Sequence, residues 1–94
     1  MVKFTPTPIM FYVYILKSKK DLMFYIGSTN NLRRRLELHN EGQVFSTRFR
    51  KPFVLVYYEA YRDEHDARHR ESNLKLRSRA FAQLKKRIER STNS

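Results

Sequence analysis

The 94-residue chain carries 20 Lys and Arg against 9 Asp and Glu, which gives a formal net charge of +11. It has no cysteine, which excludes disulfides and any cysteine-ligated metal or iron–sulfur site and fits the cytoplasmic location that we expect. No run of about 18 apolar residues occurs, so we expect neither a membrane-spanning segment nor a membrane partner. So large a positive excess in a small domain is typical of a protein that binds a polyanion, and nucleic acid is the partner we expect.

The first half of the chain predicts a β-hairpin followed by a helix. Residues 11–16 are apolar at both sets of alternating positions, which favours a strand covered on both faces. A short polar turn leads to a second predicted strand over residues 24–28, and such a short connection favours antiparallel pairing. Asn31 is a suitable N-cap for a helix over residues 32–41, and Gly42 can end that helix in a left-handed conformation.

The second half adds one strand and two helices. After a loop over residues 43–52, a third apolar strand is predicted over residues 53–60. Two helices follow, over residues 64 to about 75 and about 79–89. The polar tail, residues 90–94, is expected to fray. Asp63 is a suitable N-cap for the first of these helices. The order of elements predicts an α+β fold, with a small three-stranded antiparallel sheet flanked by helices. We expect a single domain over residues 1–94, with its core at about 11–75.

Two groups of residues in the hairpin and the first helix are candidates for chemistry. Tyr14 and Tyr25 lie on the two paired strands, although cross-strand packing alone could explain them. In the helix, Arg35 and His39 are four residues apart and therefore share one face. The run of three arginines that ends at Arg35 points in three directions, so a solvated basic surface is the simplest explanation for most of it.

Glu71 is the third candidate. It lies among basic residues and shares a helix face with Ala67 and Leu74. An ion pair with Lys75, four residues later, would explain it in purely structural terms. A carboxylate at the edge of an apolar stripe can also coordinate a hard divalent cation, which prefers oxygen ligands.

Taken in order along the chain, these segments resemble the GIY-YIG nuclease superfamily. The segments that carry the resemblance are Tyr12-Val13-Tyr14, Tyr25-Ile26-Gly27, residues 31–35 and residues 70–75. More closely, the sequence is similar to a small stand-alone bacterial branch of endonuclease-like proteins, related to the N-terminal nuclease domain found in the bacterial excision-repair nuclease. The glycine of the first motif is replaced here by Tyr12, a departure that this branch often tolerates.

The resemblance implies a role for each matching residue. The positions that it makes catalytic are Tyr14, Tyr25, Arg35, His39 and Glu71, with Glu71 as the metal ligand. Gly27 and Asn73 match structural positions of the motifs. The implied cofactor is Mg²⁺ or Mn²⁺, which suits a single carboxylate without a converging His/Cys set better than Zn²⁺ does.

The implied activity is an endonuclease that hydrolyses phosphodiester bonds, a function associated with DNA repair. DNA is favoured over RNA, and selectivity is expected for substrate structure rather than for sequence. We assign Tyr14 as the general base and Tyr25 as a positioning or phosphate-binding residue, although the sequence does not separate the two roles. A nearby Arg35, a charged His39 or a metal is expected to lower the pKa of the base.

Five other cations are expected to contact phosphates and to make binding depend strongly on salt: Arg33, Arg34, Arg48, Arg50 and Lys51. The main alternative is a non-catalytic nucleic-acid-binding module with the nuclease fold, and a third is a basic protein adaptor. Glu71 argues for the enzyme, because a carboxylate with no catalytic duty would only repel phosphate. We expect a monomer or a weak dimer, since exposed sheet edges can pair.

Overall fold

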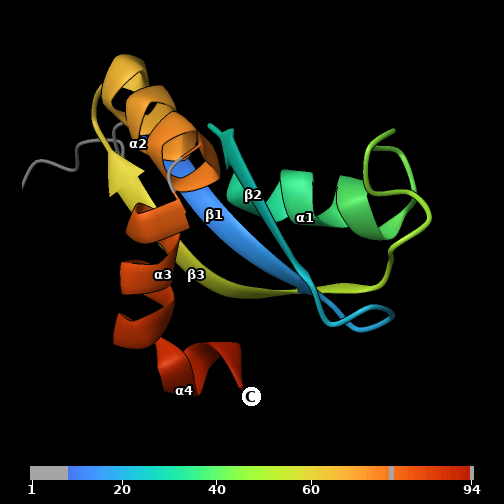
Figure 1. Ribbon diagram of the computed structural model, residues 1–94. Helices are drawn as coiled ribbons and strands as arrows, with labels where there is room; N and C mark the ends of the chain where they lie inside the picture. Colours follow the sequence, from blue (N-terminus) through green and yellow to red (C-terminus); the bar gives the residue numbers. More distant parts are fainter. Residues whose placement is uncertain (1–8, 77, 94) are drawn as a thin grey trace, which may run out of the picture.

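The fold is built on a three-stranded antiparallel sheet. The computed structural model describes residues 9–76 and 78–93, and its strands are β1 (Phe11–Ser18), β2 (Phe24–Thr29) and β3 (Phe53–Tyr61). The strand order is β2-β1-β3, so β1 lies in the middle of the sheet (Figure 1). This confirms the α+β fold, and the central position of β1 explains why both of its faces are apolar.

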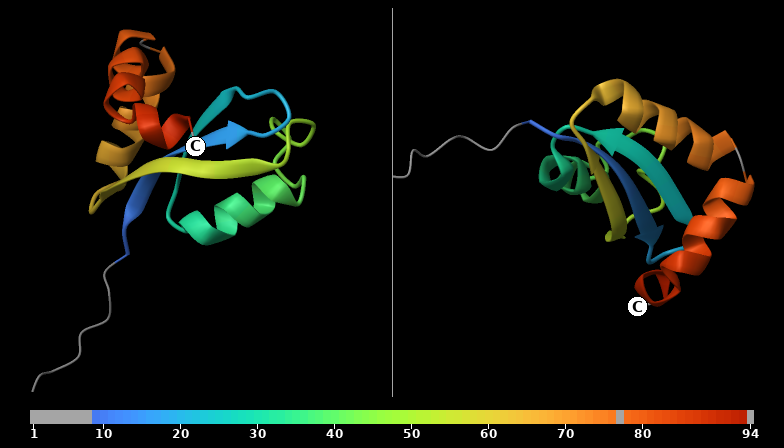
Figure 2. Two further views of the ribbon diagram at one scale, coloured as in Figure 1. Left: turned by 90° about the horizontal axis from the view of Figure 1, so that it is seen from below. Right: turned by 90° about the vertical axis from the view of Figure 1, so that its left-hand side faces the viewer.

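Helices cover both faces of the sheet. Helix α1 (Leu32–Asn40) lies on one face, and α2 (Glu64–Leu76) and α3 (Ser78–Arg87) lie on the other (Figure 2). Along β1, side chains alternate between these faces. Val13 and Ile15 belong to the larger apolar core under α2 and α3, whereas Tyr14 and Leu16 belong to a smaller cluster under α1. The larger core also includes Ile26, Ala67, Leu74 and Leu84. The smaller cluster also includes Phe53, Leu32 and Leu36.

The predicted helix boundaries follow from their capping residues. The Asn31 side chain accepts a hydrogen bond from the backbone N–H of Arg34, at 3.2 Å, and begins α1. Gly42 has φ = 75°, the left-handed conformation that ends a helix with little strain in glycine. The Asp63 carboxylate accepts from the backbone N–H groups of His65 and Asp66 at the start of α2. Local side-chain chemistry therefore sets where α1 begins and ends and where α2 begins.

The end of the chain is more ordered than expected, so the prediction of a frayed tail is wrong for the residues described. A short helix, α4 (Glu89–Thr92), follows α3, and Thr92 is buried. The Thr92 carbonyl accepts a hydrogen bond from Lys17 Nζ, at 2.7 Å, which ties this helix to β1. Among the described residues, no helix is long and apolar enough to cross a lipid bilayer.

The loop between α1 and β3 is a series of turns anchored at both ends. Asn40, at the end of α1, donates to the carbonyl of Phe53 and accepts from its backbone N–H, at 3.1 and 2.6 Å. Val44 and Thr47 point inward and are buried, although the loop is polar enough in sequence to suggest full exposure. The Lys51–Pro52 peptide bond is cis. The loop therefore has fixed inward and outward positions.

Candidate functional site

Tyr14 of β1 lies directly against Gly27 of β2. Tyr14 and Gly27 are partners in the antiparallel register, and Tyr14 is only 1% exposed. A Cβ atom on Gly27 would lie 2.5 Å from the Tyr14 hydroxyl oxygen and 2.6 Å from the ring carbon that bears it. Only glycine therefore leaves room for the ring in this position, which gives a physical reason for the glycine in the second motif.

We expect Gly27→Ala to displace the Tyr14 ring and to destabilise the protein by about 1–3 kcal/mol, the usual cost of overpacking a core. The free energy of unfolding in urea measures this cost. The same substitution in a Tyr14→Leu background should cost clearly less, because the clashing atoms are gone. Equal costs in the two backgrounds would show that the glycine is needed for another reason.

A chain of three buried side chains runs from β1 to the loop that follows α1. The Tyr14 hydroxyl lies 2.9 Å from His39 Nε2, and His39 Nδ1 lies 2.8 Å from Thr47 Oγ1. His39 is fully buried, with the rings of Tyr25 and Phe53 at 4.8 and 5.7 Å from its own. The last turn of α1 therefore presents an imidazole that is held at both nitrogens.

The hydrogen-bond partners indicate which nitrogen of His39 carries the proton. Thr47 Oγ1 also lies 3.5 Å from the carbonyl of Val44, to which it donates weakly, so it accepts from His39 Nδ1–H. His39 Nε2 is then free to accept from the Tyr14 hydroxyl, which has no other acceptor among the described residues. This assignment leaves every donor in the chain of three satisfied.

Burial shifts both titrating groups of this chain in the direction opposite to the sequence-based expectation. Burial raises the pKa of Tyr14 to about 12, although the Arg35 guanidinium beside its hydroxyl acts to lower it. Burial, aided by the charge of Arg35, lowers the pKa of His39 to about 4. At neutral pH His39 is therefore uncharged, and the expectation that a charged His39 stabilises a phenolate is wrong. Its unprotonated Nε2 can instead accept a hydrogen bond from the Tyr14 hydroxyl.

This pKa of His39 predicts an acid-sensitive fold. The value falls from 6.5 to about 4 on folding, so the neutral form stabilises the protein fully above pH 6.5 and this contribution is lost as the pH falls towards 4. The loss amounts to about 3 kcal/mol at one pKa unit per 1.4 kcal/mol. Urea unfolding between pH 7 and 4 should show a steeper loss for the wild type than for His39→Gln. Parallel curves for the two proteins would contradict this origin.

Arg35 and Tyr25 complete the group on the α1 side of the sheet. Arg35 is partly buried, and its hydrogen bond to Tyr14 is the main reason that its pKa is raised, so it stays charged. The Tyr25 ring lies 6.2 Å from that of Tyr14. Four of the five residues expected to be catalytic thus lie together, with a fixed positive charge next to a buried phenol and a neutral imidazole.

Glu71 projects from α2, on the other side of β2. Its two carboxylate oxygens accept hydrogen bonds from Ser28 Oγ and Lys75 Nζ, both at 2.7 Å. Lys75 also lies 6.0 Å from the centre of the Tyr25 ring, and the negative charge of Glu71 acts to raise the pKa of Tyr14. The ion pair that explains Glu71 structurally is therefore present, and it joins Glu71 to the aromatic group. Asn73 lies two residues further along α2 and is half-buried.

The donor set at Glu71 fits a hard divalent cation. Among the described residues, no three His, Asp or Glu side chains converge on one point. A carboxylate has about four lone-pair directions, and Ser28 and Lys75 use two of those on Glu71. Mg²⁺ is often held by one carboxylate, with water and substrate phosphate completing its shell. Glu71 is the residue that would hold such an ion here.

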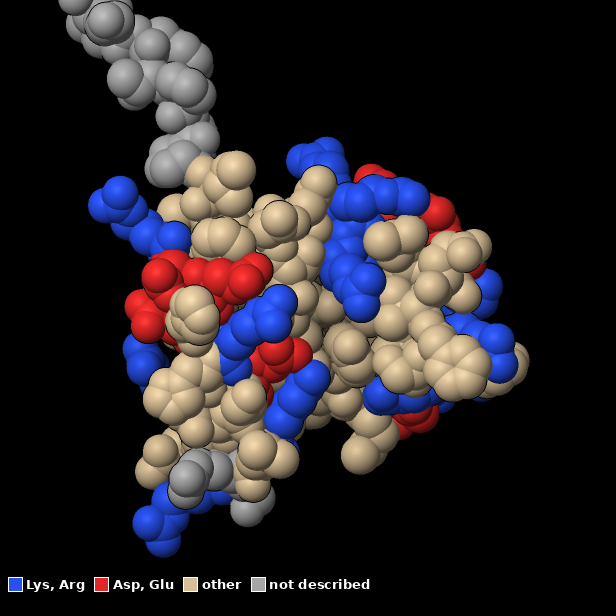
Figure 3. Space-filling model, turned by 90° about the horizontal axis from the view of Figure 1, so that it is seen from above, with Lys and Arg blue, Asp and Glu red and all other residues tan. Residues whose placement is uncertain are grey.

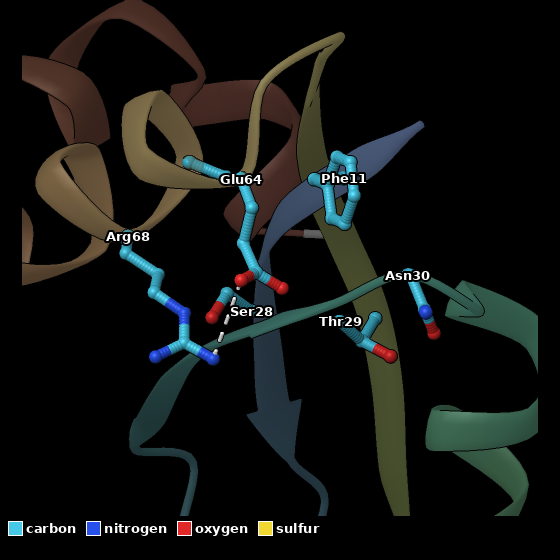
Figure 4. A pocket seen from close by; sticks show the side chains of 7 residues that line it. Phe11, Ser28, Thr29, Asn30, Glu64 and Arg68 are labelled. Atoms are coloured by element: carbon cyan, nitrogen blue, oxygen red, sulfur yellow. Dashed lines mark ion pairs between the residues drawn. The ribbon is translucent and has the colours of Figure 1, made fainter. Parts of the chain in front are cut away.

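A polar pocket of about 230 Å³ lies between the end of β2 and the first turns of α2 (Figure 4). The end of β2 and the residue after it form one wall through Ser28, Thr29 and Asn30. Glu64 and Arg68 of α2 face each other across a 3.7 Å ion pair on the opposite side. Ser28 lines this pocket and also donates to Glu71, so the pocket and the carboxylate share one residue.

The five cations expected to bind phosphate differ in their surroundings. Arg34 pairs with Glu37 and Glu41, and Arg50 pairs with Asp21 at 2.7 Å. Within the described part of the chain, Arg33, Arg48 and Lys51 have no acidic partner, so of these five cations they are the ones left free to pair with a polyanion. Seen from above, basic side chains are spread over the face, with acidic ones between them (Figure 3).

The sequence did not identify two of the polar residues that hold this group together. Thr47 lies in the loop and reaches His39 through a turn that has no regular period. Ser28 follows Gly27 on β2, but its partner Glu71 is 43 residues away along the chain. Lys75 was identified only as a partner for Glu71, and its approach to Tyr25 was not expected. Contacts of this kind become visible only once the sheet and α2 are placed together.

The fold and this arrangement of residues define the class of protein. The family model of the GIY-YIG catalytic domain matches residues 10–87, and the chain belongs to this family, whose fold is of the nuclease type. The chain is 45% identical over 71 residues to a UPF0213 protein of Clostridium perfringens, and the alignment covers 74% of this chain and 75% of the relative. It is 42% identical over 69 residues to a UPF0213 protein of Staphylococcus haemolyticus, and the alignment covers 72% of this chain and 83% of the relative.

A UPF0213 protein of Pediococcus pentosaceus is 41% identical over 71 residues, which cover 74% of each chain. No solved structure matches the chain. The relatives therefore agree with the resemblance to the small bacterial branch, and their names specify no substrate.

Proposed function

We propose that this protein is a metal-dependent endonuclease that hydrolyses phosphodiester bonds in DNA and selects substrates by their structure. The observation that carries the proposal is the buried hydrogen-bonded chain from Tyr14 through His39 to Thr47, next to the Arg35 guanidinium. A protein that only binds nucleic acid has no need of a phenol connected to a buried neutral imidazole. The cytoplasm, which the cysteine-free sequence suits, is the compartment proposed for it.

The pKa values indicate how Tyr14 would act as a base. A free phenolate is scarce at neutral pH because burial raises the pKa of Tyr14 to about 12. His39 Nε2 would take the hydroxyl proton along the 2.9 Å hydrogen bond while the tyrosine oxygen takes a proton from the attacking water, and the negative charge of a phosphate bound nearby would offset the low pKa of the imidazole. No separate phenolate needs to form, and Thr47 keeps the imidazole in the orientation that accepts this proton. Tyr14 and His39 thus act as one proton-transfer unit.

The charged residues would stabilise the phosphoryl group. Arg35 can donate N–H groups to a non-bridging oxygen and balance the charge that develops as water attacks phosphorus and the bond to the leaving oxygen breaks. Glu71 would hold Mg²⁺ or Mn²⁺, and a divalent ion there supplies charge neutralisation and lowers the pKa of bound water. Tyr25 would position the phosphate or Tyr14 through its hydroxyl and its ring.

The test is a cleavage assay with flapped, branched, nicked, single-stranded and fully paired DNA, in Mg²⁺, Mn²⁺ or EDTA. We expect cleavage with either metal, none in EDTA, and faster cleavage of one or more of the non-paired structures. RNA versions of the same substrates should be cut more slowly. Salt-sensitive binding without metal-stimulated cleavage of any substrate would instead support the non-catalytic binding module.

A further inference from the structure

Two phenylalanines in the loop after α1 are exposed on either side of an arginine. Phe45 and Phe49 are 80% and 73% exposed. The Arg48 guanidinium lies 4.5 Å from the centre of the Phe45 ring and 4.6 Å from that of Phe49. These three side chains, the Phe45–Arg48–Phe49 stack, form a surface of two aromatic faces with a cation between them.

The loop holds the stack firmly even though its rings are outside the core. The inward residues Val44 and Thr47 are buried, and turns between them place Phe45 and Arg48 outward. The carbonyl of Phe49 accepts from Lys20 Nζ at 3.0 Å, and the next residue, Arg50, is paired with Asp21. The fold therefore fixes the backbone of both phenylalanines without using their rings for stability. Exposed aromatic side chains on an ordered scaffold favour a role in binding.

We propose that the Phe45–Arg48–Phe49 stack binds unpaired nucleobases of the DNA on which the proposed nuclease acts. Every base has an aromatic face, so rings and guanidinium planes bind single-stranded segments with little sequence preference. Such bases are available at flaps, bulges and junctions but are stacked inside an intact duplex. The inference rests on the proposed function and specifies its substrate class: DNA with unpaired nucleotides close to the cleavage site.

Charge and position favour nucleic acid over a protein partner at this surface. The stack contains Arg48, which has no acidic partner among the described residues, and Lys51 follows in the same loop. Thr47, next to Arg48 in the chain, holds His39 Nδ1 at 2.8 Å, so one loop carries both the stack and the residue that orients the imidazole of the proposed proton-transfer unit.

Fluorescence titration in EDTA tests this without cleavage. The probe is duplex DNA with a single-stranded flap that carries 2-aminopurine at an unpaired position, compared with the same sequence fully paired. We expect wild-type protein to change the fluorescence of the unpaired probe through stacking. The double variant Phe45→Leu/Phe49→Leu should abolish this change and weaken flap binding roughly 5-fold to 100-fold, with binding to the paired duplex unchanged. Phe45→Tyr/Phe49→Tyr should keep both properties.

Leu76 offers a control for the loss of exposed apolar surface, since it is 83% exposed on α2, and Leu76→Ala should change nothing. If the leucine double variant binds the flap as well as wild type, the rings make only apolar contacts or none, and the inference is wrong. A wild-type protein that cleaves DNA but shows no fluorescence change also overturns it, independently of any variant. A protein that neither binds nor cleaves DNA overturns the proposed function as well.

Discussion

Glu71→Gln is expected to reduce metal-dependent cleavage roughly 100-fold to 1000-fold or more, with little change in folding. The substitution keeps the shape of the side chain and an oxygen that Ser28 can donate to, but it removes the charge that would hold a divalent cation. The lost ion pair with Lys75 is exposed enough to be worth less than about 1 kcal/mol. Single-turnover cleavage rates in Mg²⁺ and Mn²⁺, beside urea unfolding curves, measure the two effects separately.

The matched control for this variant is Glu37→Gln. Glu37 is also a helix carboxylate in an ion pair, with Arg34 at 3.1 Å, but it lies on the exposed face of α1. Glu37→Gln should leave the cleavage rate unchanged. Any loss of cleavage in Glu71→Gln that Glu37→Gln does not show is then specific to the site. Wild-type cleavage rates in Glu71→Gln would mean that the metal, if one acts, is held elsewhere.

Tyr14→Phe is expected to lower cleavage by about 100-fold to 10,000-fold, the range typical of a general base. It removes only the hydroxyl, and the ring should stay against Gly27. His39 Nε2 would then lack its buried donor, which costs about 1–3 kcal/mol of stability. Nucleic-acid binding should be retained, because the phenol contributes no positive charge. Rates at saturating DNA, together with binding measured in EDTA, distinguish loss of the base from loss of affinity.

Tyr25→Phe separates the two tyrosines, which the sequence does not. Tyr25 contacts His39 through its ring, at 4.8 Å between centres, and this contact survives the loss of the hydroxyl. We expect a clearly smaller loss of cleavage than for Tyr14→Phe. A larger loss for Tyr25→Phe than for Tyr14→Phe would reverse the proposed roles.

Local patterns were sufficient to predict the three strands and the first three helices. The continuous apolar character of residues 11–16 indicates a strand covered on both faces, and β1 is the central strand. Asn31 and Asp63 act through hydrogen bonds to the next few residues, so their effect is visible in the sequence. The order of the tail was missed because it depends on Lys17, 75 residues away from Thr92 along the chain.

The membership of the site was easier to predict than its charge state. Tyr14, Tyr25, Arg35 and His39 lie together as the resemblance implies, because strand register and helix period place them. The protonation of His39 was predicted incorrectly, since its burial depends on Phe53 and on the loop that carries Thr47. Phe45 and Phe49 would ordinarily be assigned to a core, and only the turns of the loop show that they point outward.

The alternation along β1 links the proposed activity to the pairing of the strands. Val13 and Ile15 point into the larger core while Tyr14, between them, points to His39. A slip of the strand by one residue would exchange these faces, placing the phenol in the core and an aliphatic chain beside the imidazole. Any cleavage that the protein shows would therefore report that β1 and β2 are in register. Misfolded forms with intact helices would be inactive, even where bulk measures of helix content are unchanged.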